Sequence, residues 1–438
     1  MTRQALEVFD GMARVGRLGY ESLDETFSFE YDPRWLELAG SYSISPHILT
    51  YGQPAPSSTI RRFLDNLLPE GRALDVVATA NRVSKNNLYG LIRELGQETS
   101  GALSFLPEGA GTTRNSAAKR EIGRDELRQR IEERAQLPFM VWDGRVRMSI
   151  AGYQDKLAVY LDHDRMYLVE GELASTHVLK PEPEGGLPML VANEHFCMSL
   201  ARRLGLAAAR VDILRLPDPV LVVERFDRVR DDERVRRLHI IDGCQALNFP
   251  ASYKYERNFG SGRGVRHIRD GASFRLLFSL AAEYAVQKAV TRLGMMRWAL
   301  FNYLIGNTDA HGKNISFFCR HDGLWLAPFY DLVSVVQYDG LDHELAMSYG
   351  DAFLLKDIAP YQWADFAAVT GTPRPLLARE MRRLGKAALA AAPAQAAEDI
   401  YVSAEKDLVQ RIGTFVQDQA KKLLEMATPM TQIDPSLL

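Results

Sequence analysis

Residues 301–318 read FNYLIGNTDAHGKNISFF, and residues 326–335 read LAPFYDLVSV. In the first segment Asp309 is followed five positions later by Asn314, and Asp331 lies in the second segment behind a short predicted hairpin. This order is typical of phosphoryl transfer, in which the first aspartate orients the attacking hydroxyl and accepts its proton. The asparagine and the second aspartate can hold Mg²⁺ against ATP phosphates, because Mg²⁺ takes hard oxygen ligands and needs only one or two carboxylates.

A surface turn is the alternative interpretation of the same loop, because Asp, Asn and Gly tolerate left-handed backbone and cap their own turns. The flanking segments favour the catalytic interpretation. Residues 296–306, MRWALFNYLIG, are strongly apolar, and residues 314–319, NISFFC, are typical of a buried strand. Several polar groups between two buried elements need a reason, because burying charge without a partner is costly.

The composition is that of an ordinary globular protein, with 438 residues of which 46% are hydrophobic and 25% charged. This length predicts about three domain-sized units. A net charge of −3 from 53 basic and 56 acidic residues excludes a global polycationic signal for nucleic acid, although a local basic patch remains open.

Three cysteines, Cys197, Cys244 and Cys319, have neither metal-ligand spacing nor a disulfide pattern, which predicts a reducing, cytoplasmic environment. The N-terminal segment carries charges where a signal peptide needs its apolar core. Because no run of about 18 apolar residues occurs, we expect no membrane span.

The chain begins with β-rich segments. Residues 5–20 predict a hairpin that turns at Asp10 and Gly11, and residues 26–31 alternate like a strand. Residues 41–48 predict a further extended segment. Three helices and then a short strand are expected in residues 57–71, 72–83, 85–99 and 101–109.

A polar linker in residues 109–135 leads into a charged helix, and a domain boundary is expected near residue 139. The alternating charges of this helix favour a solvated face over a nucleic-acid patch. After the boundary, strands are expected in residues 146–161 (strand–turn–strand), 165–170, 175–182 and 219–228. One amphipathic helix, residues 192–206, interrupts them, and a mostly antiparallel sheet with one inserted helix is the shape of a kinase small lobe. The mixed-charge segment 228–237 predicts a hairpin without a function.

From residue 238 onward the pattern is mainly helical. Residues 274–306 are long, apolar and helix-like, which predicts the core of a larger lobe. Further amphipathic helices are expected in residues 356–371, 373–392 and 398–427. Residues 428–438 predict a loose tail.

Six motifs, taken together, resemble those of the HipA-type serine/threonine kinases, which are toxins of bacterial toxin–antitoxin modules. They are LDNLLPEG, SIAGYQDK, STHVLKPE, VERFDR, IGNTDAHGKN and FYDLVSV, and they follow the family's order over nearly the whole chain. The resemblance implies an α+β, two-lobed protein-kinase-like fold. Its expected parts are an N-terminal β/α subdomain (1–139), a small lobe with the phosphate loop (140–237) and a mainly helical large lobe (238–430).

The resemblance and the spacing agree that Asp309 is the catalytic base and that Asn314 and Asp331 are the metal ligands. His311 and Lys313 lie in the same loop, where they either contact phosphate or brace Asp309. For His311 a purely structural role and a ligand-contacting role both remain open.

Lys180 ends the strand STHVLK, and a strand lysine that reaches the ATP α/β-phosphates is a recurrent kinase feature. Glu194, early in the following helix, is its natural partner. Position alone would make Lys180 a surface lysine at a strand end, but the other motifs favour contact with ATP.

The motif SIAGYQDK resembles the family's phosphate-covering loop, whose backbone N–H groups can cradle anionic oxygens. The resemblance assigns nucleotide contacts to Ser149, Ala151, Gly152, Tyr153, Gln154, Asp155 and Lys156. Family members autophosphorylate a serine at the position of Ser149, which ejects the loop and switches the kinase off. This sequence departs from the family at Tyr153, where a small residue is common.

Glu224, Arg225 and Phe226 fall where the family's lobes join and where its backbone contacts adenine. A strand that ends in a salt bridge is the alternative, and backbone recognition leaves no side-chain signature. The basic, Gly-rich segment 254–267 loosely matches the family's activation loop, and either a substrate-ordered loop or a flexible connector fits it.

The resemblance implies an ATP- and Mg²⁺-dependent serine/threonine-protein kinase that autophosphorylates on Ser149. An aminoacyl-tRNA synthetase, such as glutamyl-tRNA synthetase, is the expected external target, so that translation and growth stop. The expected partner is a HipB-like helix-turn-helix antitoxin, which would mediate any contact with DNA. The alternatives are a lipid or small-molecule kinase, disfavoured because no basic amphipathic membrane helix is evident, and an inactive kinase-fold co-repressor.

Overall fold

Two units, each assembled from segments distant in sequence, make up the chain. The computed structural model describes residues 3–110, 118–147, 154–171, 173–231 and 234–438. Unit 1 comprises Met1–Glu184, Leu214–Ala251 and Phe317–Leu324, and unit 2 comprises Gly185–Ile213, Ser252–Ser316 and Trp325–Leu438. The predicted division into three parts, at residues 139 and 237, stays a prediction.

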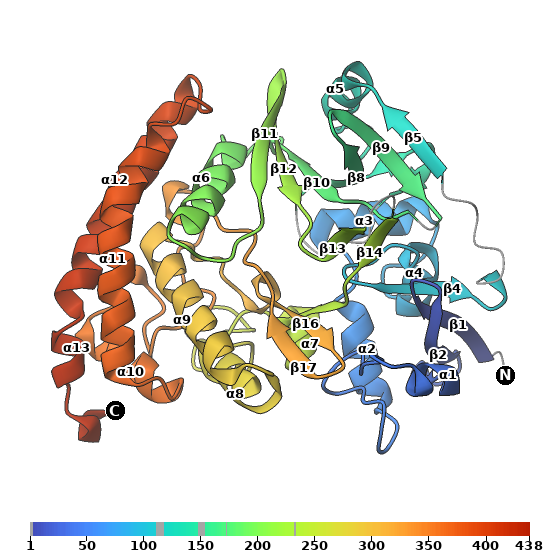
Figure 1. Cartoon of the computed structure of the whole chain (residues 1–438), viewed down its shortest axis with the longest axis horizontal. Helices are drawn as coiled ribbons and strands as arrows, with labels where there is room; N and C mark the ends of the chain where they lie inside the picture. The colour runs from blue at the N-terminus through green and yellow to red at the C-terminus, as the bar shows by residue number, and fades with distance from the viewer. Residues whose placement is uncertain (1–2, 111–117, 148–153, 172, 232–233) are drawn as a thin grey trace. The chain divides into compact units, whose positions relative to one another are not determined.

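Unit 1 begins with a four-stranded antiparallel sheet in the order β3-β2-β1-β4 (Figure 1). Its strands are β1 (Arg3–Asp10), β2 (Ala13–Glu21), β3 (Thr26–Tyr31) and β4 (Leu103–Pro107). The predicted hairpin is confirmed, since Gly11 takes the left-handed φ of +56° that the turn requires. Helices α1 (Pro33–Glu37), α2 (Ser57–Asp65), α3 (Gly71–Ala80) and α4 (Leu88–Leu95) complete this region.

The extended segment predicted for residues 41–48 does not become a strand. It forms only an isolated bridge between Ser45 and Ile48. The Tyr31 hydroxyl holds its backbone instead, accepting a hydrogen bond from Ile44 N–H at 2.9 Å and donating one to the Ile48 carbonyl at 2.5 Å. A side chain from β3 therefore takes the place of a neighbouring strand.

A six-stranded sheet in the order β11-β12-β10-β8-β9-β5 follows, and all of it except the first half of β11 belongs to unit 1. Its strands are β5 (Ala118–Ile122), β8 (Leu157–Asp162), β9 (Arg165–Glu170), β10 (His177–Pro181), β11 (Val211–Leu216) and β12 (Asp218–Glu224). The antiparallel pairing that the sequence predicted is confirmed. Phe139, Trp142 and Leu157 are buried in the core on one face, beside helix α5 (Arg124–Glu132).

The prediction of a polar linker before α5 is wrong for residues 118–122, which form the edge strand β5. Four of its five residues are exposed, and only Ile122 is buried. The Lys119 ammonium lies 4.3 Å from the centroid of the Tyr160 ring in β8. Because an edge strand is mostly solvated and charged, its sequence resembles a linker.

Short strands complete the β-structure. β6 (Val141–Trp142) pairs with β7 (Arg145–Val146), and β13 (Arg228–Asp231) pairs with β14 (Arg234–Arg237), which confirms the predicted 228–237 hairpin. β15 (Ile240–Asp242), β16 (Ser316–Arg320) and β17 (Gly323–Leu326) form a three-stranded sheet beside α7 (Gly243–Ala246). The predicted strand NISFFC is confirmed as β16. The apolar run after Asp331 is not a strand, because Ser334 N–H donates to Asn193 Oδ1 at 2.8 Å and a 3-10 turn follows.

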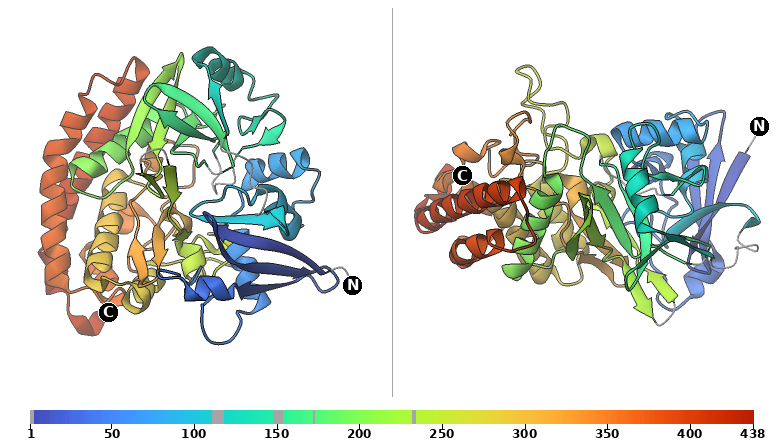
Figure 2. Two further views of the ribbon diagram at one scale, coloured as in Figure 1. Left: turned by 45° about the vertical axis from the view of Figure 1, so that its right-hand side comes forward. Right: turned by 90° about the horizontal axis from the view of Figure 1, so that it is seen from above.

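Unit 2 is mainly helical, with α11 and α12 lying side by side in both views of Figure 2. Its helices are α6 (Leu190–Arg203), α8 (Phe274–Tyr284), α9 (Lys288–Ile305), α10 (Pro360–Val369), α11 (Arg374–Ala396), α12 (Ala404–Met426) and α13 (Pro429–Gln432). The long apolar run 274–306 divides into two helices at Ala285, whose backbone is extended and whose side chain is buried.

The predicted loose tail is ordered as α13 and a short 3-10 turn. Met430 is fully buried, and the Tyr361 hydroxyl donates to the Leu437 carbonyl at 2.8 Å. One buried side chain in a short polar segment was too weak a signal to predict this.

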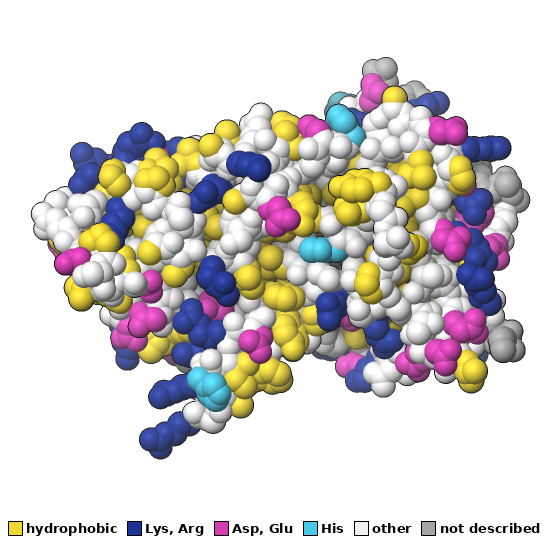
Figure 3. Space-filling model, turned by 90° about the horizontal axis from the view of Figure 1, so that it is seen from below, with side chains coloured by type: hydrophobic (Ala, Val, Ile, Leu, Met, Phe, Trp, Pro, Cys, Tyr) yellow, Lys and Arg dark blue, Asp and Glu magenta, His cyan; other side chains and the backbone are white. Residues whose placement is uncertain are grey.

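Charges of both signs alternate with hydrophobic side chains on the face shown in Figure 3. This mixture agrees with the nearly balanced charge of the sequence. Within the described residues, every helix is too short or too polar to serve as a transmembrane span. The described residues include all three cysteines, which are buried and form no disulfide.

Candidate active site

The candidate catalytic loop, residues 306–314, begins where α9 ends. Gly306 takes a φ of +66°, and its N–H donates to the Tyr303 carbonyl at 3.3 Å. A Cβ atom here would lie 2.5 Å from the Val336 side chain and 2.8 Å from that of Phe415. Both the backbone conformation and the crowding therefore require glycine, and the helix stops at this residue.

Buried amides position the residue at the centre of the loop, Asp309. Asn302 Nδ2 donates to the Trp298 carbonyl at 2.9 Å, and Asn307 Nδ2 donates to Asn302 Oδ1 at 2.9 Å. Asn307 Oδ1 then accepts from Asp309 N–H at 3.1 Å. The two asparagines are only 1% and 3% exposed, and the sequence analysis missed them. An asparagine within a strongly apolar helix was the available signal.

Asn314 closes the loop from its other end. Its Nδ2 donates to the Asp309 carbonyl at 2.9 Å, and its N–H donates to the His311 carbonyl at 2.9 Å. Because the amide nitrogen is used inside the loop, the side-chain oxygen points the other way. This oxygen is the atom that a metal ligand must present.

His311 is buried and neutral. Its Nδ1 accepts a hydrogen bond from Lys313 N–H at 3.3 Å, so the ring proton is on Nε2. The pKa of His311 is lowered to about 3, mainly by burial; the charge of Lys254 acts in the same direction, and the charge of Asp331 opposes it. These contacts fit the bracing role better than that of a charged phosphate ligand.

Asp331 lies close enough for its charge to act on His311. Its backbone has a φ of +57°, a left-handed conformation that is uncommon outside glycine and is often found at functional sites. The preceding residue anchors it, since the Tyr330 hydroxyl donates to the Lys313 carbonyl at 2.6 Å. Unit 2 thus brings together the five site residues predicted in the two motifs, Asp309, His311, Lys313, Asn314 and Asp331.

Asp309 itself is exposed, and its Oδ1 accepts a hydrogen bond from the Tyr255 hydroxyl at 2.7 Å. Tyr255 lies in the segment 254–267, and no local pattern in the sequence marked it as a site residue. An exposed carboxylate on a loop held by hydrogen bonds can accept a proton from a hydroxyl placed next to it.

The donor set fits a magnesium ion that also binds phosphate oxygens. In the described part of the chain, no group of three His, Cys, Asp or Glu side chains could hold a metal by itself. Asn314 and Asp331 supply one amide oxygen and one carboxylate, and Mg²⁺ in kinases takes its remaining ligands from ATP and water. A dedicated all-protein metal site is therefore not required.

The other predicted nucleotide contacts belong to unit 1. Lys180 is half-buried in β10, opposite Leu221 of β12. Lys156 is 6% exposed, and Gln154 and Asp155 are half-buried. Burial raises the pKa of Asp155. Ser149, Ala151, Gly152 and Tyr153 lie outside the described residues.

Glu194, the predicted partner of Lys180, is a residue of α6 in unit 2 and is 2% exposed. Since Lys180 belongs to unit 1, their pairing stays a prediction. At the end of β12, Glu224 is exposed and Phe226 half-buried. Arg225 N–H donates to the Thr176 carbonyl at 2.9 Å, so this amide is already used.

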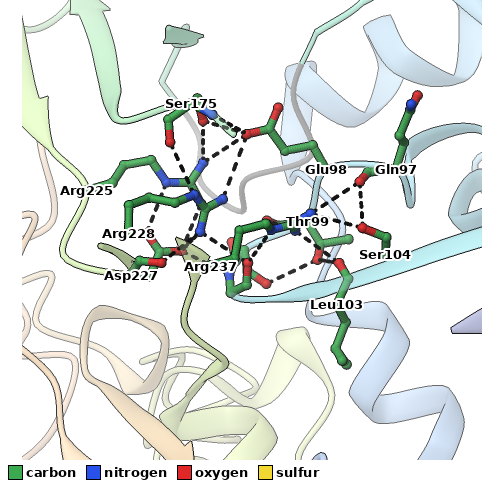
Figure 4. A network of polar contacts seen from close by, with 12 residues as sticks. Gln97, Glu98, Thr99, Leu103, Ser104, Ser175, Arg225, Asp227, Arg228 and Arg237 are labelled. Atoms are coloured by element: carbon green, nitrogen blue, oxygen red, sulfur yellow. Dashed lines mark hydrogen bonds and ion pairs between the residues drawn. The ribbon is translucent and has the colours of Figure 1, made fainter. Parts of the chain in front are cut away.

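The Arg225 side chain is part of a buried arginine network in unit 1 (Figure 4). Arg225 binds Asp227 through two hydrogen bonds of 3.0 and 2.8 Å and donates to Ser175 Oγ at 3.0 Å. The remaining members are Glu98, Arg228 and Arg237. Arg228 Nη1 lies 2.8 Å from Asp227 Oδ2, and Arg237 donates to the carbonyls of residues 99, 101 and 103. The 228–237 hairpin, to which the sequence assigned no function, thus supplies the buried Arg228 and the half-buried Arg237.

Burial and the neighbouring charges shift the pKa values of the ionisable groups in this network. Burial raises the pKa of Asp227, but Arg225 and Arg228 outweigh burial and hold it well below its usual range. Burial lowers the pKa of Arg228 to about 9, and the positive charge of Arg225 adds to this effect. Burial also raises the pKa of Glu98, but the neighbouring arginines lower it overall. Three guanidinium groups thus share two carboxylates in a largely buried site.

Comparison with known proteins gives matches over most of the chain. A HipA N-terminal domain model matches residues 6–106, and a HipA-like C-terminal domain model matches residues 148–395. The serine/threonine-protein kinase toxin HipA of Shewanella oneidensis is 42% identical over 384 residues, 87% of each chain. A putative kinase of Sinorhizobium fredii is 32% identical over 432 residues, 96% of this chain and 99% of that one.

A solved structure of the Shewanella oneidensis MR-1 toxin–antitoxin system HipA, with HipB and its operator DNA, matches with a TM-score of 0.88. The two chains are 38% identical in this alignment, which covers 98% of this chain and 100% of the other. The likeness therefore includes both units.

Proposed function

Because this chain belongs to the HipA family of serine/threonine-protein kinase toxins, we propose that it transfers the γ-phosphoryl group of ATP, with Mg²⁺, to a serine or threonine hydroxyl. The structural match also confirms the predicted kinase-like α+β fold. One observation carries the proposal: side-chain amides hold the backbone of Asp309 in a loop that also presents Asn314, with Asp331 nearby.

In the proposed reaction, Asp309 orients the acceptor hydroxyl and takes its proton as the oxygen attacks the γ-phosphorus. The bond from the γ-phosphorus to the bridging oxygen breaks, and ADP leaves with that electron pair. Asn314 and Asp331 would hold Mg²⁺, which neutralises charge on the phosphates when bound. Lys180 and Lys156 would contribute positive charge to the phosphates, and His311 would keep the loop in shape.

Autophosphorylation of Ser149 is the proposed form of self-regulation. Ser149 lies in a motif that resembles the family's phosphate loop, where a phosphate would add roughly −1.5 to −2 charges. Repulsion from the phosphates of ATP would then oppose nucleotide binding. The phosphorylated chain is therefore expected to be the inactive form.

A HipB-like antitoxin is the proposed partner. The solved relative is HipA of Shewanella oneidensis in a complex with HipB and its operator DNA. This chain matches that HipA over nearly its whole length, which supports a similar assembly in which the antitoxin mediates contact with DNA. An aminoacyl-tRNA synthetase, glutamyl-tRNA synthetase in particular, is the proposed external substrate, and halted translation is the proposed outcome.

Intact mass spectrometry before and after incubation with Mg-ATP tests the proposal. The wild-type chain is expected to gain one phosphate that maps to Ser149, and Asp309→Gln is expected to gain none. Asp339→Asn, which changes an exposed aspartate of the same unit, is the matched control and should behave like wild type. If Asp309→Gln still gains the phosphate, or remains toxic in cells, the assignment of the base is wrong.

A further inference from the structure

Tyr255 contacts the proposed catalytic base directly. Its hydroxyl donates to Asp309 Oδ1 at 2.7 Å. Its ring meets the His311 ring edge-on, with centroids 5.2 Å apart and planes at 88°. The Lys254 ammonium lies 5.4 Å from the tyrosine ring centroid. Two of these three contacts are made with the catalytic loop itself.

The backbone on both sides of the tyrosine is connected to the same loop. On the side before it, Gly312 N–H donates to the Lys254 carbonyl at 2.9 Å. On the side after it, Glu256 N–H donates to the Ala346 carbonyl at 2.9 Å, and Ala346 N–H donates to the Thr308 carbonyl at 2.8 Å. The tyrosine therefore cannot shift along the loop without breaking hydrogen bonds on both sides.

The backbone at Gly271 also packs closely against Tyr255. A Cβ atom on Gly271 would lie 1.8 Å from the Tyr255 carbonyl oxygen, so the two backbones pass in close contact. The buried Glu256 carboxylate accepts hydrogen bonds from Ser348 N–H at 2.8 Å and from Arg269 Nε at 2.7 Å. The segment that carries Tyr255 is thus fixed from inside unit 2, although the tyrosine itself is 37% exposed.

We infer that Tyr255 is a positioning residue, which fixes the rotation of the Asp309 carboxylate so that it meets the acceptor hydroxyl in a productive orientation. An exposed aspartate can rotate about two side-chain bonds, and a hydroxyl bonded to one carboxylate oxygen removes most of that freedom. A hydrogen bond to a carboxylate is stronger than one between neutral groups, so it can hold the side chain against solvent. This inference rests on the proposed function of Asp309.

The same contact would act differently if Tyr255 were a gate that blocks the base. A gate has to leave when substrate binds, and removing its hydroxyl would then raise the rate. The connections on both sides of the tyrosine and the close passage of Gly271 favour a fixed support. The two roles therefore predict opposite effects of removing one oxygen atom.

Tyr255→Phe tests this, because it removes the hydroxyl and keeps the ring against His311. We expect kcat for phosphorylation of a serine peptide to fall roughly 10- to 100-fold, the value of one hydrogen bond to a charged group. The KM for ATP should stay within about twofold, because only the orientation of the base changes. Tyr361→Phe, which also removes a hydrogen-bonded hydroxyl from unit 2, is the matched control and should keep wild-type kcat. An unchanged or increased kcat for Tyr255→Phe overturns the inference.

A second measurement does not depend on kinase activity. With 3-fluorotyrosine at position 255, the ¹⁹F resonance should shift in Asp309→Asn and stay in place in Asp339→Asn. If it does not shift, the contact and the inference fail, whatever the kinase assay shows. The resonance could shift although the wild-type chain transfers no phosphate. In that case the contact exists, but the proposed function fails, and with it the role of Tyr255 in positioning a catalytic base.

Discussion

The candidate catalytic loop of unit 2 and the arginine network of unit 1 are both dense in polar side chains and largely buried, yet they are built from different groups. The loop is held by amides and carbonyls, with Asn307 and Asn314 bonded to the backbone of Asp309. The network is held by ion pairs, in which Arg225 and Arg228 share Asp227.

This difference separates a candidate site from a structural cluster. In the loop, the side-chain amides of Asn307 and Asn314 hold the backbone of Asp309, and its carboxylate stays exposed. In the network, the charges compensate one another, and removing one would leave its partners buried without compensation. Buried charge by itself is therefore weaker evidence of function than an exposed carboxylate whose backbone is held by side-chain amides.

The same chemical change should have opposite consequences in the two regions. Asp309→Asn removes one negative charge from the loop, and we expect kcat to fall by roughly 10²- to 10⁴-fold, the usual contribution of a general base. Because Asp309 is exposed, the free energy of unfolding should change by less than about 0.5 kcal/mol. Peptide phosphorylation assays and urea denaturation measure the two quantities. If Asp309→Asn lowered the free energy of unfolding by several kcal/mol, the distinction between a functional loop and a structural network would be wrong.

Asp227→Asn removes one negative charge from the network, and here we expect the free energy of unfolding to decrease. Three arginines would then share the single carboxylate of Glu98, and breaking a buried pair typically costs about 3–5 kcal/mol. Urea denaturation at neutral pH measures the loss. Asp231→Asn is the matched control, since Asp231 is exposed in the same hairpin and its replacement should leave the unfolding midpoint nearly unchanged. An Asp227→Asn variant as stable as the control would show that the network is dispensable.

Acid should weaken the network as the pH falls toward 4. The pKa values of Asp227 and Glu98 are lowered in the folded chain, so their stabilisation is complete above the unfolded pKa values of about 4. The unfolded chain takes up protons first as the pH falls, and the free energy of unfolding should therefore decrease below about pH 4. Denaturation curves between pH 7 and pH 3 test this, and the slope should be smaller for Asp227→Asn. Parallel slopes in both proteins would place the acid sensitivity elsewhere.

Sequence patterns were sufficient for the elements with clear periodicity and for the residues of the two motifs. The β1–β2 hairpin, the antiparallel sheet, the paired strands β13 and β14 and the strand β16 follow the patterns that predicted them. The loop brings Asp309, His311, Lys313 and Asn314 together because they are near neighbours in sequence. Asp331 joins them because the hairpin of β16 and β17 returns the chain to this point.

What the sequence did not reveal depends on contacts between distant segments. Tyr255 lies 54 residues before Asp309, and Glu98 lies far from Arg225 and Arg228 along the chain. No local pattern marks an arginine that will be buried, because in a mixed-charge hairpin it resembles a solvated one. Edge strand β5 and the ordered tail were missed for a related reason, since each depends on one or two buried side chains.

The smallest expected effect concerns His311. Its variants test whether this residue braces the loop or takes part in acid–base chemistry. Because burial lowers the pKa of His311 to about 3, the ring stays neutral above that pH and should contribute no step to the kcat profile between pH 5 and pH 8. His311→Asn should lower kcat by less than about tenfold, because the asparagine oxygen can replace Nδ1 as acceptor of the Lys313 N–H. His311→Ala lacks an acceptor and should lose more activity. A profile that loses a step near neutral pH in both variants would show that His311 takes part in proton transfer, and the loop would then hold an ionisable group where the structure places a neutral brace.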